Sequence, residues 1–433
     1  MRHINLFFLL LIAGSSLLKG QVLTTEDAVK MTLANNYDIL VAKGQVQQAL
    51  NNTGKFNQGM LPTASANAGG QYNLSSATVE KQDGNEFTVN NIASNSLNAG
   101  VGVNYVIYAG KSRLYNIEKF KTIYQRSDLE VRSLIERTLL QVYNQYYQIA
   151  QLQQNSENIA ASLSISNRRL TRAKYGQEYG QNTRLEVLNA TVDIDNDSIS
   201  YVNIQQQLAN AKRSMNLLLG RDIDTAFEID TTVLFAEDLL LSQLLKDGQL
   251  KNVNLLAAQK NIDLNDLDLK LNHSQKLPTV STFAQYGWNY LNSGPTSLFA
   301  KQNSLGLNLG ISAQYTIFDG GRRRVNEQNI KVAREMNKTQ LYKLEQSLER
   351  DIKNAWQAYQ NALFVLNAQQ NNVKTSQLNF DYTKDRFEAG QVSSILFRQA
   401  QLNLLFAKNN LNQAKYNAKL TEITLLQLSG NLL

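Results

Sequence analysis

Hydrophobic and polar residues alternate with a period of two in four segments of the chain, and this pattern predicts β-strands. In the clearest segment, the apolar positions from Leu305 to Ile317 share one face, and small or polar residues from Gly306 to Thr316 share the other. The predicted strands cover about 62–74, 96–109, 278–290 and 304–318. Such strands are long enough to cross a bilayer when tilted, with the apolar face toward lipid. An ordinary sandwich sheet with a buried apolar face would show the same alternation.

Two very long segments without proline predict α-helices, over about 111–176 and about 320–389. Each would reach roughly 100 Å at 1.5 Å per residue. In the second segment, apolar residues from Leu341 to Leu366 recur every three or four positions, as in coiled coils. A further helix is predicted from Glu26 to Gly59, with Thr24 or Thr25 as its N-cap and Pro62 after its end.

The chain contains an internal duplication. A shift of 210 positions places Tyr108-Ala109-Gly110 on Phe318-Asp319-Gly320 and Gly180-Gln181 on Gly390-Gln391. Upstream, a shift of 216 places Leu61-Pro62 on Leu277-Pro278. A repeat this long is a duplicated subdomain and not a solenoid unit.

The duplication divides the chain into a first repeat (21–220), a linker (221–236) and a second repeat (237–433). Each repeat is predicted to run helix, strand, strand, long helix, helix. Because four strands cannot close a barrel and open edges are not tolerated in lipid, closure requires several chains. Three chains would give about 12 strands, within the range of bacterial barrels, although two or four chains remain open.

The N-terminus is typical of a secretory signal peptide, predicted over 1–20. Arg2 and His3 precede an apolar run from Leu6 to Ile12, and small residues follow. The chain has no cysteine and only 2 histidines, His3 and His273. This composition excludes disulfides, thiolate zinc sites, cysteine nucleophiles and histidine-based triads, so neither an enzyme nor a cofactor is predicted.

Taken in order, these features resemble the TolC family of outer-membrane efflux channels. The resemblance rests on the duplication, the Leu-Pro pairs before each first strand, the junctions 105–110 and 315–321, and the glycine turns at Gly180 and Gly390. It implies a mainly α fold with membrane β-strands. A homotrimeric 12-stranded β-barrel in the outer membrane would be continued by a long periplasmic α-helical barrel. It also implies a passive duct that works with a periplasmic adaptor protein and an inner-membrane pump.

The resemblance places the periplasmic tip at the two glycine turns. Adaptor docking is therefore expected at Gly180, Gln181, Gly390 and Gln391. Glycine allows the backbone to leave the helix at such a turn.

The resemblance also implies an aperture lined by a pair of acidic residues after the second glycine turn, but the two corresponding residues here are Leu396 and Gln399. The matching positions in the first repeat are Glu186 and Asn189. Glu186 could form an acidic ring in a trimer, or it could be an ordinary solvated helix charge. A hydrophobic constriction near Leu396 and Phe397 is an alternative hypothesis.

Aromatic residues near the strand ends predict two membrane-interface girdles. Tyr105, Tyr108, Tyr315 and Phe318 would form the periplasmic girdle, and Tyr72, Trp288 and Tyr290 the outer one.

Two charged motifs carry no separate function. The Arg322-Arg323-Arg324 run is expected at the membrane edge, and no nucleic-acid partner is predicted. Asp193, Asp195 and Asp197 lack the glycine and glutamate of a calcium loop. A stand-alone porin or a structural coiled-coil protein of the envelope remain alternatives to the export duct.

Overall fold

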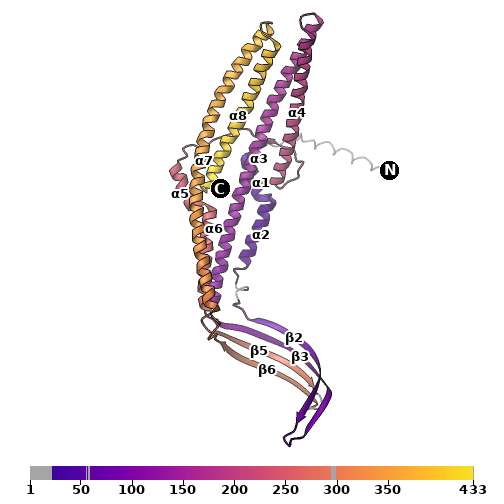
Figure 1. Cartoon of the computed structure of the whole chain (residues 1–433), viewed down its shortest axis with the longest axis vertical. Helices are drawn as coiled ribbons and strands as arrows, with labels where there is room; N and C mark the ends of the chain where they lie inside the picture. Colours follow the sequence, from indigo (N-terminus) through magenta and orange to yellow (C-terminus); the bar gives the residue numbers. More distant parts are fainter. Residues whose placement is uncertain (1–21, 55, 57–58, 294–298, 433) are drawn as a thin grey trace, which may run out of the picture. The chain divides into compact units, whose positions relative to one another are not determined.

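The computed structural model describes residues 22–54, 56, 59–293 and 299–432, so the predicted signal peptide lies outside the described residues. Figure 1 shows the elements, which are mostly helical. The helices are α1 (Thr25–Asn35), α2 (Tyr37–Asn51), α3 (Ser112–Glu178), α4 (Arg184–Leu218), α5 (Leu241–Lys251), α6 (Val253–Ser274), α7 (Arg322–Glu388) and α8 (Ser394–Leu428). The strands are β1 (Val22–Leu23), β2 (Thr63–Glu80), β3 (Glu86–Ala109), β4 (Glu228–Ile229), β5 (Thr279–Asn292) and β6 (Lys301–Gln314).

The duplication appears in the lengths and the spacing of the helices. α3 and α7 each contain 67 residues, and α4 and α8 each contain 35. The corresponding helices begin 210 positions apart, which is the shift found in the sequence. None of the helices in the described part of the chain combines the length and the apolar character that a membrane-spanning helix requires.

The chain divides into two compact units that do not follow the two repeats. The first unit comprises 1–44, 129–256 and 342–433, and the second comprises 45–128 and 257–341. Each unit therefore contains segments of both repeats. The duplicated halves are repeats of sequence and of element order, and neither of them is a compact unit alone.

The core of the first unit lies where α3 packs against α4 and α8. Tyr146, Met215 and Leu219 are fully buried there, and Tyr147 stacks on Tyr416 with ring centroids 5.7 Å apart. The Tyr146 hydroxyl lies 2.9 Å from the carbonyl oxygens of Leu23 in β1 and Asp230 just after β4, and its single hydrogen is shared between these two acceptors. Burying a tyrosine this deeply requires such partners for its hydroxyl.

The helix predicted from Glu26 to Gly59 is wrong in two respects, since it breaks at Asn36 and ends at Asn51. The Asn36 side chain donates to the Leu218 carbonyl at 2.9 Å, and its Oδ1 accepts from the first amides of α2. Asn252 makes the same bonds in the second repeat, with the Leu428 carbonyl as acceptor. Asparagine ends one helix and caps the next because its amide satisfies backbone groups at both termini.

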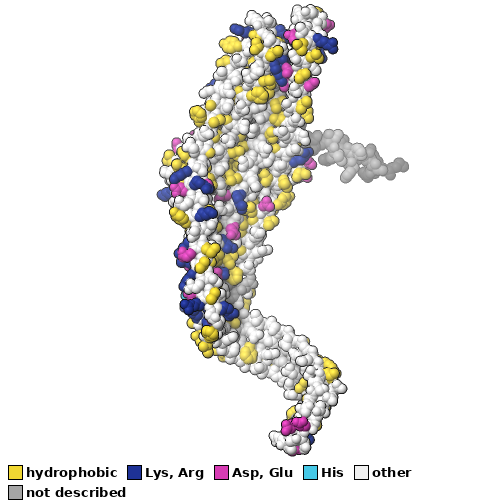
Figure 2. Space-filling model, viewed as in Figure 1, with side chains coloured by type: hydrophobic (Ala, Val, Ile, Leu, Met, Phe, Trp, Pro, Cys, Tyr) yellow, Lys and Arg dark blue, Asp and Glu magenta, His cyan; other side chains and the backbone are white. Residues whose placement is uncertain are grey.

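The second unit contains a four-stranded antiparallel sheet in the order β2-β3-β5-β6 (Figure 1). The polar stretch between about 75 and 95 lies outside the predicted strands 62–74 and 96–109, but in the structure it continues the hairpin, with Glu80 paired to Glu86. β6 ends at Gln314, so the last four residues of the strand predicted to reach 318 lie outside the sheet. In Figure 2, charged side chains on the strands gather at the turn between β2 and β3, where Glu80, Lys81, Asp83 and Glu86 lie.

Candidate functional site

The two turns that join the long helices to α4 and α8 have the same geometry. Gly180 and Gly390 adopt left-handed φ angles of 74° and 72°. The amide of Gln181 bonds the carbonyl of residue 176 at 2.7 Å, and the amide of Gln391 bonds the carbonyl of residue 386 at 2.8 Å. This closure satisfies the last carbonyls of the helix and leaves both glutamine side chains exposed. The sequence predicted both turns at these residues.

Glu186 has a local structural role at the start of α4. The backbone N–H of Thr183 donates to its carboxylate at 3.2 Å, and the Thr183 hydroxyl accepts from the Glu186 amide. This capping box satisfies two amides that would otherwise lack partners. In the second repeat Ser393 caps α8, but the position equivalent to Glu186 is Leu396, so the reciprocal bond is absent there. These bonds give Glu186 a helix-capping role within the chain, and the acidic ring of an oligomer stays a prediction.

Phe397 is a packing residue in this chain, so its predicted place in a hydrophobic constriction needs correction. Its side chain is buried, and its ring stacks on Phe387 at 4.7 Å and on Phe380 at 5.6 Å between centroids. Leu396 is 57% exposed. The helical period turns consecutive residues about 100° apart, so only Leu396 of this pair is free to line an opening.

Asn189 and Gln399, the other two candidate aperture residues, are exposed. The Gln399 amide donates to the Asn403 side chain one turn later, at 2.8 Å.

A buried ion-pair network near the turns was not predicted. Arg398 of α8 donates to both carboxylate oxygens of Asp197 on α4, each at 2.8 Å. Ser166 of α3 donates to the same carboxylate at 2.6 Å. Arg169 of α3 pairs with Asp193 at 3.0 Å and donates to the Ser394 hydroxyl at 2.9 Å. The network therefore connects three helices that come from both repeats.

The charges of this network set its protonation states. Burial raises the pKa of Asp197, but the hydrogen bonds from Arg398 and Ser166 and the charges of both arginines outweigh burial and lower it below its usual value. Burial also lowers the pKa of Arg169, while Asp193 opposes that effect. Asp197 is thus ionised at neutral pH and holds the Arg398 guanidinium in place.

The sheet in the second unit has two chemically different faces. Pairing places Ala66, Val101, Tyr286 and Leu307 in one row across the four strands. The three larger residues of this row are 53–63% exposed. Paired residues on the neighbouring row of the other face are Ser65, Gly102, Gln285 and Asn308. One face is therefore apolar and exposed in the described part of the chain, and the other is small and polar.

The aromatic residues proposed as girdles lie toward the two ends of the apolar face. Tyr72 is 67% exposed, and Trp288 stacks on Tyr290 with centroids 6.3 Å apart, toward the end of the sheet far from the helices. At the other end, a β-bulge between Val106 and Tyr108 brings Tyr108 opposite Val280. Strict alternation would have put Tyr108 on the same face as Val106, so the bulge keeps it with Tyr105.

Tyr315 and Phe318 are 59% and 82% exposed, but both follow the end of β6. They therefore do not belong to the strand on which the girdle prediction placed them.

The strand-to-helix junction in the second repeat is held by Asp319. Its carboxylate accepts from the amides of Gly321 and Arg323 and pairs with the Arg323 guanidinium at 2.7 Å. Arg323 also donates to the carbonyls of Gln275 and Thr316. In the first repeat Arg113 donates to the carbonyls of Gly59 and Ile107 in the same manner. Both repeats thus use an arginine to fix the sharp turn between strand and long helix.

A family model for outer membrane efflux proteins matches residues 28–221 and 244–431. The chain belongs to the outer membrane efflux protein family. It is therefore an outer-membrane efflux channel that extends into the periplasm, and it is not an enzyme. This match confirms the resemblance that the duplication and the junctions indicated.

Individual members of the family are similar over nearly the whole chain. The outer membrane protein TolC of Vibrio cholerae is 20% identical over 404 residues, which cover 92% of this chain and 88% of that protein. The CmeC outer membrane channel of Campylobacter jejuni superposes with a TM-score of 0.77 at 16% identity, over 94% of this chain and 86% of CmeC. VceC of Vibrio cholerae gives 0.71 at 14% identity, over 94% and 96%. These two structures share the fold of this efflux protein.

Proposed function

We propose that this efflux protein is the passive exit duct of a tripartite export system. Three copies would close a 12-stranded β-barrel in the outer membrane and continue it as a periplasmic α-helical barrel. A periplasmic adaptor protein would dock at the turns around Gly180 and Gly390, and an inner-membrane pump would supply the substrates. The observation that carries this proposal is the sheet, whose two faces suit lipid on one side and water on the other.

The edges of the sheet support closure by several chains. In the described part of the chain, β2 and β6 each have one edge without a strand partner. An open edge in lipid leaves a row of amides and carbonyls without partners, at a cost of several kcal/mol per group. In a trimer, β2 of one chain would pair with β6 of the next, and no edge would remain.

Cysteine cross-linking between the edges tests this closure without interference, because the chain has no native cysteine. Ala66→Cys would be combined in turn with Leu305→Cys, Leu307→Cys and Leu309→Cys, all on the apolar face. We expect at least one pair to give covalent dimers and trimers on non-reducing gels after mild oxidation. Ala66→Cys with Gly306→Cys, on opposite faces, is the control that should remain monomeric. Monomers for every pair would contradict the proposed closure.

Capture of the partner at the turns tests the other part of the proposal. A photo-crosslinker attached to Gln391→Cys in the native periplasm is expected to capture an adaptor protein, identified by mass spectrometry. The same reagent at Asn361→Cys, an exposed position 30 residues up α7, should capture much less of it. Equal capture at both positions, or capture of this chain alone, would favour the stand-alone porin or the structural protein over the export duct.

A further inference from the structure

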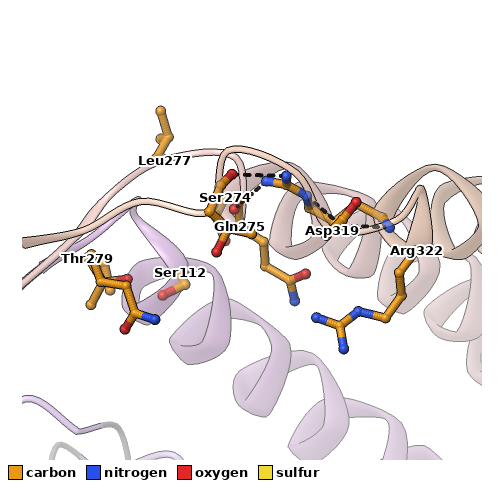
Figure 3. A pocket seen from close by; sticks show the side chains of 11 residues that line it. Ser112, Ser274, Gln275, Leu277, Thr279, Asp319 and Arg322 are labelled. Atoms are coloured by element: carbon orange, nitrogen blue, oxygen red, sulfur yellow. Dashed lines mark hydrogen bonds and ion pairs between the residues drawn. The ribbon is translucent and has the colours of Figure 1, made fainter.

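A polar recess of about 370 Å³ lies at the junction between β5, β6 and the start of α7. Figure 3 shows its lining, in which the guanidinium of Arg322 and the amide of Gln275 extend toward the same space beside Ser112. Thr279 and Gln314 border it from the strands. The lining is therefore rich in groups that can donate hydrogen bonds to an anion.

The strand register places this recess at the end of the polar face of the sheet. Thr279 pairs with Gln314, and the next pair on the same face is Ser281 with Ser312. This is the face that carries Gln285 and Asn308, opposite to the apolar row through Leu307. If the apolar face contacts lipid, the recess opens toward water inside the duct. The inference below thus rests on the proposed function.

The carboxylates of the junction already have cationic partners. Asp319 is held by Arg323, and this pair is nearly neutral as a unit. The hydrogen bond from Lys331, together with the charges of Lys331 and Lys276, lowers the pKa of Glu327 to about 2. Among the described residues, Arg322 forms no ion pair, although its side chain lines the recess. Figure 2 shows Lys and Arg side chains gathered where α7 begins, so the local potential is positive.

The duplication makes this site unique to the second repeat. The positions equivalent to Arg322 and Asp319 in the first repeat are Ser112 and Ala109, which carry no charge. Among the arginines that line the recess, Arg323 is paired with Asp319, so each chain contributes the Arg322 guanidinium to this site and a trimer would present three. Fixed charges arranged around a pore select ions of the opposite sign.

We propose that the recess binds the carboxylate or phosphate group of anionic solutes in the duct, and that Arg322 gives the channel a preference for anions. A guanidinium presents two parallel N–H groups that match both oxyanions. Gln275, Gln314 and the Ser112 hydroxyl supply neutral donors around it. The ligand class is a water-soluble organic acid or phosphate ester, which would pause at this site during passage.

Reversal potentials of the purified protein in planar bilayers test the charge selectivity. The gradient of KCl should be tenfold with a low side near 0.1 M, where the Debye length is about 10 Å and fixed charges still act. We expect Arg322→Gln to lower the chloride-to-potassium permeability ratio about twofold or more, and Arg322→Lys to preserve it. Arg324→Gln removes the same charge from an exposed residue outside the recess, and it should leave the ratio within about 20%.

Current block separates binding from a general field effect and identifies the oxyanion. Citrate and inorganic phosphate, added separately, are expected to reduce the chloride current of the wild-type channel at millimolar concentrations. Arg322→Gln should raise the half-blocking concentration about fivefold or more, while Arg324→Gln should not. Unchanged selectivity and unchanged block in Arg322→Gln channels would overturn the inference. Failure of the wild-type protein to form channels at all would instead reject the proposed duct.

Discussion

Replacing Leu307 by arginine is expected to reduce the folded protein in the outer-membrane fraction about tenfold or more, whereas Asn308→Arg should leave most of it in place. Leu307 lies mid-strand in β6 on the apolar face and is 63% exposed in the chain. A lipid-facing arginine near the bilayer midplane costs about 2–4 kcal/mol, while a lumen-facing one is tolerated. Each chain of an oligomer would carry this destabilisation, so its effect on the assembled protein is multiplied. Membrane fractionation followed by gels of unheated samples measures the result.

A second substitution separates lipid contact from burial against protein. Leu307→Trp should be tolerated if the apolar face contacts lipid, because acyl chains accommodate a larger side chain. A close-packed protein core would instead lose about 1–3 kcal/mol to overpacking. Equal loss of the Leu307→Arg and Asn308→Arg proteins would contradict the assignment of the two faces. Loss of the Leu307→Trp protein would favour the sandwich sheet that the sequence left open.

The elements with strong periodicity were predictable because their pattern is local. The long helices lack proline, and glycine and a capping residue mark both turns, so α3 and α7 end within two residues of their predicted ends. The alternation predicted all four strands of the sheet. The extension of the β2–β3 hairpin was missed because its alternating segments, 77–80 and 86–90, are short and a register shift between Ser75 and Ala77 interrupts the pattern.

The parts of the candidate site that were missed depend on contacts between distant segments. Nothing near Asn36 breaks the helical pattern, and its amide acts only because the Leu218 carbonyl lies beside it in the fold. Leu396 and Phe397 are adjacent hydrophobic residues. Only the packing of α7 against α8 shows that Phe397 is buried and Leu396 is exposed. The Arg398–Asp197 pair joins residues 201 positions apart, so no local sequence pattern predicts it.

Replacing Asp197 by asparagine is expected to lower the thermal unfolding midpoint of the purified protein by roughly 2–4 °C. The substitution leaves the Arg398 guanidinium, whose side chain is 12% exposed, without its bidentate partner. Removing one partner of a buried ion pair costs about 3–5 kcal/mol, and the residual exposure here reduces this to about 2–4 kcal/mol. Tryptophan fluorescence follows the transition, since the chain contains 2 tryptophans, Trp288 and Trp356.

Asp195→Asn is the matched control, because it removes the same charge from an exposed position two residues away on α4. Its midpoint should stay within about 1 °C of the wild type. Equal shifts for both variants would show that the pair is not specially stabilising.

The pH dependence gives a further readout of the same pair, because the folded pKa of Asp197 lies below its ordinary value of 3.8. The stabilisation is therefore complete above that ordinary value, and it is lost as the pH falls through the lower, folded pKa. The difference in unfolding midpoint between the wild type and Asp197→Asn should therefore disappear only in acid, below about pH 4. An advantage that declined near neutral pH instead would mean that Asp197 is not held ionised by Arg398, and that another group sets the stability of this helical contact.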